Sequence, residues 1–226
     1  MSEPEYIFLV RHGESVGNVD WNIHATVPDW KIHLTDKGKE QAERAAAKLH
    51  EDITSRLPYY LKNSSSSDAT PLRIYCSPYA RTRETAKPIR RAFPEHVYRE
   101  DPRIREQDWG NYKNLKTARK IVTERDSFGT FFYRLPDGES GADVYDRVST
   151  FFDTLWRDFR APGFPRTAII VSHGLTIRLI LMRWFHWTVE EYELLRNPYN
   201  CQIIRMHKPM YAKHYILEST LRKRKA

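Results

Sequence analysis

Short runs of strand-forming residues alternate with longer stretches of helical periodicity along this chain of 226 residues. Strands are predicted at residues 6–10, 72–76 and 167–171, and the first and last of these are continuous runs rich in apolar strand formers. Such continuous runs are typical of strands that are buried on both faces of a parallel sheet. The alternation predicts an α/β fold, namely a three-layer sandwich with a mostly parallel central sheet and helices on both faces.

The predicted helices have recognisable ends. One begins at the N-cap residue Thr35, and another begins at Ser140, which opens a Ser-x-x-Asp capping box. A helix that begins at Pro78 is expected to end or bend near Pro88, because an internal proline lacks the amide hydrogen that the helix needs. Two late strands are predicted, at residues 201–206 and 214–217.

Polar tripeptides directly follow two of the predicted strands. Arg11-His12-Gly13 follows residues 6–10, and Ser172-His173-Gly174 follows residues 167–171. Ligands bind at the carboxyl ends of the strands in sheets of this kind. We therefore expect His12 and His173 to lie close together in a binding site.

The residue types at these strand ends are suited to phosphoryl groups. A neutral imidazole is a competent nucleophile, and its ordinary pKa of about 6.5 keeps much of it neutral near neutral pH. Arg11 precedes His12, and Arg81 lies at the start of a helix, where anions are favoured. The guanidinium fork of arginine matches the oxygens of a phosphate group. The pattern predicts a phosphate site.

Composition narrows the range of partners. Lysine and arginine number 37 against 29 acidic residues, so the chain carries a net charge of +8 that favours anionic partners. The basic residues are scattered, and no motif for reading nucleic acid is present, so nucleic acid is not the expected partner.

No apolar run approaches the roughly 18 residues of a membrane helix, and the acidic start is not typical of a secretory leader. We expect a cytoplasmic protein without a membrane partner.

Two departures from a uniform domain stand out. A serine-rich insertion is predicted at residues 62–70 within a single domain that covers residues 1–218. Residues 219–226 form a basic C-terminal tail. A solvated, frayed tail is the simplest interpretation, and nuclear targeting or binding to an acidic surface is the alternative.

The chain resembles the histidine phosphatase superfamily, in the phosphoglycerate-mutase-like branch. The motifs that carry the resemblance occur in the family's order: Arg11-His12-Gly13-Glu14-Ser15, Asn18, Leu34-Thr35 to Gln41-Ala42, Ser77 to Arg81 with Thr85-Ala86, Gly138-Glu139-Ser140 and Ser172-His173-Gly174. Residues 25–32 and 105–111 are similar to a plant and fungal subgroup of phosphoglycerate-mutase-like proteins and broad-range acid phosphatases.

The resemblance implies a role for each site residue. His12 would attack phosphorus and form a phosphohistidine, and Glu106 would protonate the leaving alkoxide and then activate water. The implied phosphate-binding residues are Arg11, Asn18, Arg81 and His173. Glu14 and Glu139 are rival candidates for the acid, and Asp108 lies close to Glu106 in sequence.

No metal or other cofactor is expected. Cys76 and Cys201, the only cysteines, lack the spacing of a zinc site and suggest no disulfide framework. His12 follows Arg11, and both site histidines are expected to lie in arginine-rich surroundings, whose positive charge would repel a metal cation. The implied mechanism also needs no metal.

The expected function is a metal-independent phosphomonoesterase that acts through a phosphohistidine on small phosphorylated compounds. A broad substrate range and an acidic pH preference are expected. The alternatives are a phosphoglycerate mutase, a sugar-bisphosphate phosphatase and, from another class, a catalytically weak protein that only binds phosphorylated ligands. Members of the family are often dimers, so the resemblance also makes a homodimer a candidate assembly.

Overall fold

A six-stranded sheet forms the centre of the molecule, and the computed structural model describes residues 3–56, 72–110 and 115–224. The strands are β1 (Tyr6–Arg11), β2 (Leu72–Cys76), β3 (His96–Glu100), β4 (Thr167–Ser172), β5 (Ile203–His207) and β6 (Ile216–Leu217). Their order across the sheet is β3-β2-β4-β1-β5-β6. The pairs among β1 to β4 are parallel, while β5 runs antiparallel to both β1 and β6.

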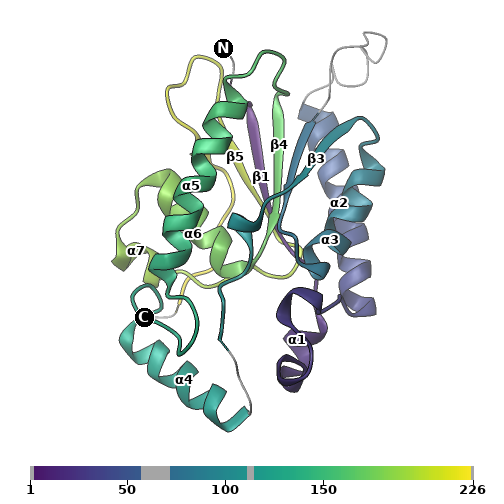
Figure 1. The fold of residues 1–226 in the computed structure, drawn as a ribbon. Helices are drawn as coiled ribbons and strands as arrows, with labels where there is room; N and C mark the ends of the chain where they lie inside the picture. The colour runs from purple at the N-terminus through teal and green to yellow at the C-terminus, as the bar shows by residue number, and fades with distance from the viewer. Residues whose placement is uncertain (1–2, 57–71, 111–114, 225–226) are drawn as a thin grey trace.

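Helices cover both faces of this sheet, so the predicted α/β class is confirmed (Figure 1). Helices α2 and α3 lie on one face, and helices α5 and α6 lie on the other. The α-helices are α1 (Val16–Val19), α2 (Asp36–Arg56), α3 (Ala80–Ala92), α4 (Leu115–Phe128), α5 (Gly141–Phe159), α6 (Gly174–Phe185) and α7 (Val189–Glu193). The described residues also include the short 3-10 helices η1 (Trp21–Ala25), η2 (Asp29–Lys31) and η4 (Pro102–Ile104).

Strand β4 shows why its sequence is apolar without interruption. Successive side chains of a strand point to opposite faces of the sheet. Ala168 and Ile170 therefore pack in the core under α5 and α6, whereas Ile169 and Val171 pack in the core under α2 and α3. Both faces of the strand are buried, so alternation with polar residues is absent.

The register of the sheet brings three strand ends together. Strand β4 lies between β1 and β2, with Arg11 opposite Ser172 and Cys76 opposite Val171. The residues that follow, His12, Ser77 and His173, therefore leave the sheet at the same edge. Figure 1 shows this edge at the bottom of the view, between α1 and α4. The predicted meeting of the strand ends is thus confirmed.

Helix α3 differs from its prediction. It begins at Ala80, two residues after the predicted start, and continues through Pro88 to Ala92, so of the two expected outcomes an end near Pro88 is wrong. Ala86 and Ile89 are fully buried in the core beside Pro88, which is itself buried. The contacts of this face evidently outweigh the lost hydrogen bond of the proline, a cost of about 3 kcal/mol or more.

The end of the described chain is attached to the domain. The amide of Arg224 donates to the carbonyl of Leu194 at 2.7 Å, and the amide of Arg196 donates to the carbonyl of Arg222 at 2.9 Å. In contrast to the expected frayed tail, the chain is therefore ordered as far as Arg224.

The insertion predicted at residues 62–70 lies outside the described residues. No helix in the described part of the chain combines the length and the apolar character needed to cross a membrane.

Candidate active site

His12 directly follows β1, and its Nε2 has no hydrogen-bond partner among the described residues. The side chain is 2% exposed, and Nδ1 lies 2.7 Å from the carbonyl oxygen of Gly13. A carbonyl can only accept a hydrogen bond, so Nδ1 carries the proton and Nε2 keeps its lone pair. Gly13 allows the backbone to pass close to Gly38, because a Cβ at this position would lie 2.5 Å from the carbonyl oxygen of Gly38. The fold therefore presents Nε2 as the nucleophilic atom.

The surroundings of His12 keep its ring neutral. Burial lowers the pKa of the imidazole well below its usual value, and the positive charges of Arg81 and Arg11 lower it further. A protonated ring has no lone pair with which to attack phosphorus. The low pKa of His12 therefore maintains the reactive form at neutral and mildly acidic pH.

His173 lies directly beside His12, with 5.2 Å between the two ring centroids. Its Nε2 is 2.7 Å from the hydroxyl oxygen of Ser77, while its Nδ1 is buried without a hydrogen-bond partner among the described residues. When the Ser77 hydroxyl donates to Nε2, the proton of the neutral ring lies on Nδ1. His173 then offers a buried donor to an oxygen atom bound between the two rings.

Two arginines supply positive charge to the same site. Nη1 of Arg11 donates to the carbonyl of Pro198 at 2.6 Å, and its buried Nε has no partner among the described residues. Arg81 is 5% exposed and lies in the first turn of α3. The carboxylate of Asp29 accepts bonds from Nη1 and Nη2 of Arg81 at 2.9 and 3.1 Å. Since a guanidinium has five hydrogens, Arg81 keeps donors for a phosphate group.

Asn18 lies in α1, at the exposed side of the site. Its Oδ1 accepts from the amide of Ser15 at 3.1 Å and from Nδ2 of Asn200 at 3.1 Å. These bonds fix which atom is oxygen and which is nitrogen. The Nδ2 group of Asn18 is therefore the end that can donate to an anion, as the predicted phosphate-binding role requires.

Glu106 follows η4 and approaches the two histidines. Its side chain is 17% exposed, and Oε2 lies 3.8 Å from Nδ1 of His173. Burial raises the pKa of Glu106, although the positive charge of Arg81 opposes this shift. A carboxyl group with a raised pKa stays protonated over a wider pH range than a surface glutamate. This is the property that a general acid needs.

The rival acids lie in different environments. Hydrogen bonding to a lysine ammonium holds the pKa of Glu14 below its usual value. Burial alone would raise the pKa of Glu139, but hydrogen bonds and the charge of Arg147 hold it low. Asp108 is exposed and caps a nearby backbone amide. Glu106 combines a raised pKa with a position 3.8 Å from Nδ1 of His173, so it is the strongest candidate for the acid.

The residues around the nucleophile could also be considered as metal ligands. Among the described residues, one ligand atom from each of His12, Glu106 and His173 lies within 4.8 Å of the others. After burial, the charge of Arg81 is the largest cause of the lowered pKa of both histidines. The same charge repels a cation. The donor set fits the oxygens of a phosphoryl group better than it fits a metal ion.

The roles of three supporting residues were not predicted from the sequence. Asp29 orients Arg81, Ser77 holds His173, and Asn200 donates to the carbonyl of His12 at 3.2 Å. Ser77 could have been found, because it directly follows β2 at the edge where the histidines lie. Asp29 lies within residues 25–32, which carry the subgroup resemblance, but that resemblance assigned it no role, and no signal marks Asn200.

Asp29→Asn is expected to raise the KM for phosphomonoesters about 10-fold with a smaller change in kcat, because a bond to a charged acceptor is stronger than one to a neutral amide. Arg81 would then lose its fixed orientation toward the phosphate. Steady-state kinetics with p-nitrophenyl phosphate measure this effect. Asp36→Asn removes an exposed carboxylate at the start of α2 and is the matched control. An unchanged KM would show that Arg81 needs no help from Asp29.

The fold, together with two histidines, two arginines and a partly buried carboxyl at one edge of the sheet, fits a phosphoryl-transfer site of the histidine phosphatase type. The family model of the histidine phosphatase superfamily (branch 1) matches residues 7–209. The chain therefore belongs to this superfamily, and the predicted membership is confirmed.

Curated relatives place the chain more closely within the superfamily. Phosphoglycerate mutase-like protein AT74 of Arabidopsis thaliana is 47% identical over 88% of this chain, but the chain covers only 64% of that protein's length, less than two thirds. The broad-range acid phosphatase DET1 of Saccharomyces cerevisiae is 30% identical, with 98% of this chain and 91% of that protein covered. The predicted similarity to plant and fungal proteins is also confirmed.

Solved structures show the same fold. The mycobacterial glucosyl-3-phosphoglycerate phosphatase in complex with VO3 matches with a TM-score of 0.68 and 20% identity over 97% of this chain and 100% of that chain. An open-reading-frame product of Mycobacterium tuberculosis matches with a TM-score of 0.68 and 24% identity, covering 97% of this chain and 98% of that one. At these identities the match concerns the fold alone.

Proposed function

We propose that this protein is a metal-independent phosphomonoesterase that hydrolyses small phosphorylated compounds through a phosphohistidine at His12. One observation carries the proposal. The free Nε2 of a neutral histidine, a buried donor on His173 and a carboxyl with a raised pKa at Glu106 meet in a single site. These are the three groups that nucleophilic phosphoryl transfer requires.

In the first step, the lone pair of His12 Nε2 attacks phosphorus and the bond from phosphorus to the leaving oxygen breaks. Glu106 transfers its proton to that oxygen, so the product leaves as an alcohol. Arg11, Arg81 and the Nδ1 hydrogen of His173 bind the other three oxygens and stabilise their charge during transfer. The result is a phosphorylated His12 and an ionised Glu106.

In the second step, the ionised Glu106 accepts a proton from a water molecule as the water oxygen attacks phosphorus. The bond between phosphorus and Nε2 breaks, and the ring recovers its lone pair. Inorganic phosphate leaves, and Glu106 is again protonated. The balance is one water consumed for each phosphate released, with no other reactant.

Phosphate release measures the proposal directly. Purified protein is incubated with p-nitrophenyl phosphate, sugar phosphates and 3-phosphoglycerate at mildly acidic pH, with a chelator present. We expect release that is insensitive to the chelator. Formation of 2-phosphoglycerate without release would instead support the mutase, an alternative that the similarity to AT74 keeps open. Loss of release on chelation would contradict the metal-independent mechanism.

The pH profile for alkyl phosphates should be highest on the acidic side of neutral. Activity needs a protonated Glu106, so it falls as pH rises through the raised pKa of this group. It also needs a neutral His12, so it falls as pH drops through the lowered pKa of the ring. The profile of kcat/KM against pH measures both limbs. A rate that rises steadily from acidic to alkaline pH would contradict these assignments.

A further inference from the structure

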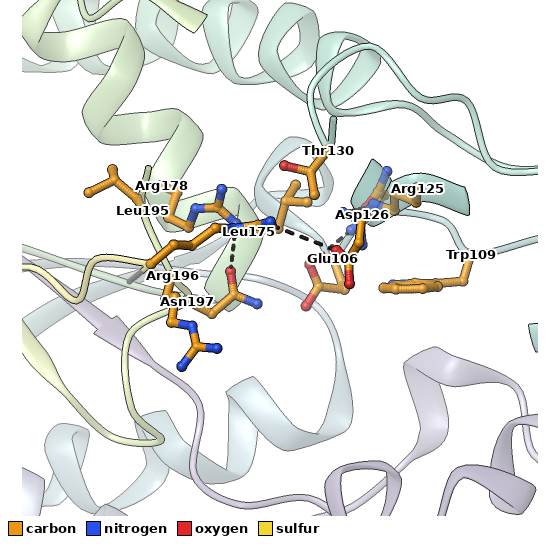
Figure 2. A pocket seen from close by; sticks show the side chains of 12 residues that line it. Glu106, Trp109, Arg125, Asp126, Thr130, Leu175, Arg178, Leu195, Arg196 and Asn197 are labelled. Carbon is orange, nitrogen blue, oxygen red and sulfur yellow. Dashed lines mark hydrogen bonds and ion pairs between the residues drawn. The ribbon is translucent and has the colours of Figure 1, made fainter. Parts of the chain in front are cut away.

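A cavity of about 510 Å³ opens beside the phosphoryl site, and Glu106 belongs to both. This volume lies within the range of about 300–1,000 Å³ that is usual for small-molecule sites. Figure 2 shows Glu106 with Trp109 on one side and with Arg178, Arg196 and Asn197 on the other. A substrate whose phosphate lies between the histidines would extend past Glu106 into this space.

Arginines dominate the charge of the cavity. Four of its lining residues are arginines, and they come from separate parts of the chain: Arg125 from α4, Arg178 from α6, Arg196 from the segment after α7, and Arg224 from the C-terminal end. The lining includes two acidic groups, Asp126 and Glu106. Because Glu106 is neutral when it acts as an acid, the cavity is strongly positive in the productive state.

Two of these arginines are buried without a counter-ion. Arg178 is 5% exposed and Arg125 is 8% exposed, and neither forms an ion pair within the described residues. Arg178 donates to neutral oxygens of Asn197 and Tyr192, each at 3.2 Å, and Arg125 donates to Gln107 at 2.9 Å. Both have a buried Nε without a hydrogen-bond partner there. Each guanidinium lies over an aromatic ring, Arg178 at 4.2 Å from the centroid of Tyr192 and Arg125 at 4.9 Å from that of Trp109. A ring only partly offsets a buried charge, and buried charges are ordinarily paired, so these two arginines are suited to an anionic ligand.

The rim of the cavity is also basic. The side chain of Arg196 is exposed and has no hydrogen-bond or ion-pair partner in the described part of the chain. The pairing of Arg224 with Asp126 is loose, at 3.7 Å. Arg196 and Arg224 can therefore turn toward a ligand without breaking a strong interaction. The rim could complete the coordination of an anion that the buried arginines attract.

We propose that this cavity is a second anion subsite, which binds a carboxylate or second phosphoryl group of the same small substrate. Arginine can bind either group through two parallel hydrogen bonds. The proposal rests on the phosphatase function proposed above, and it narrows the substrate class to phosphomonoesters that carry another acidic group.

A matched pair of substrates tests the subsite. 3-Phosphoglycerate and glycerol 1-phosphate have the same phosphorylated three-carbon skeleton, but only the former carries a carboxylate. We expect the wild-type kcat/KM, counting all products formed, to be higher for 3-phosphoglycerate than for glycerol 1-phosphate. Arg196→Glu should reduce the ratio of these two values at least about 10-fold. Arg157→Glu reverses an exposed charge on α5, outside the cavity, and is the matched control. Fructose 1,6-bisphosphate and fructose 6-phosphate form a second pair for a phosphoryl group.

The subsite proposal is overturned if wild-type protein prefers the more acidic substrate in neither pair, or if Arg196→Glu and Arg157→Glu have equal effects. Either result leaves the phosphatase proposal intact. Binding to His12→Ala separates the two proposals if no substrate is turned over. Calorimetric titration of this variant should still show tighter binding of 3-phosphoglycerate than of glycerol 1-phosphate, and Arg196→Glu should remove the difference. That result would support the subsite and reject the phosphatase, whereas equal binding would overturn both.

Discussion

Replacement of His12 by alanine is expected to reduce phosphate release about 10³-fold or more, since it removes the attacking nitrogen and the neighbouring His173 directs its Nε2 toward Ser77. The remaining arginines and His173 can still bind the substrate, so binding should survive better than turnover. His12 lines the site instead of filling the apolar core, and the variant should therefore fold. Phosphate release and a thermal unfolding curve measure both expectations.

His214→Ala is the control for this change. His214 is exposed near the C-terminal strand β6 and has no part in the site. Its replacement should leave phosphate release within about twofold of wild type, as expected of a surface substitution. Turnover that persists in folded His12→Ala protein at close to the wild-type rate would assign the chemistry to another residue.

Glu106→Gln is expected to slow hydrolysis of alkyl phosphates by about 10²- to 10⁴-fold, the usual contribution of general acid catalysis. An alkoxide is a poor leaving group and needs the proton. A nitrophenolate leaves readily without one, so p-nitrophenyl phosphate should lose much less in the first step. The ratio of kcat/KM for the two substrates measures the effect, and the alkaline limb assigned to Glu106 should disappear.

Asp108→Asn provides the matched control for the acid. Asp108 is an exposed carboxylate two positions further along the chain, and it contacts the backbone of Gly110 instead of the histidines. Its replacement should leave the preference between the two leaving groups unchanged. Equal losses on both substrates in Glu106→Gln, or a selective loss in Asp108→Asn, would remove Glu106 from the role of acid.

The centre of the site was predictable because it depends on the sheet. Residues 6–10 and 167–171 have an unambiguous apolar pattern, and parallel strands bring their carboxyl ends to one edge. Register then sets the result, since Arg11 pairs with Ser172 and the next residues are the two histidines. The sequence pattern and the topology rule together were sufficient to place His12 beside His173.

Residues on irregular segments were harder to place. Asp29 lies on a 3-10 turn in a stretch without hydrophobic periodicity, so nothing in the sequence indicates that it reaches Arg81. The arginines of the anion cavity come from four distant segments, and they look like scattered surface charge when read along the chain. Pro88 shows the opposite problem, because a strong local rule gave way to packing around the buried Ile89.

Trapping of the phosphorylated enzyme tests the central claim most directly. Wild-type protein is mixed with p-nitrophenyl phosphate and quenched under alkaline conditions, in which phosphohistidine is stable, and its peptides are analysed by mass spectrometry. We expect one phosphoryl group on the peptide that contains His12, formed at least as fast as turnover and absent from His12→Ala. Wild-type protein that turns over while His12 never carries a phosphoryl group would contradict the mechanism.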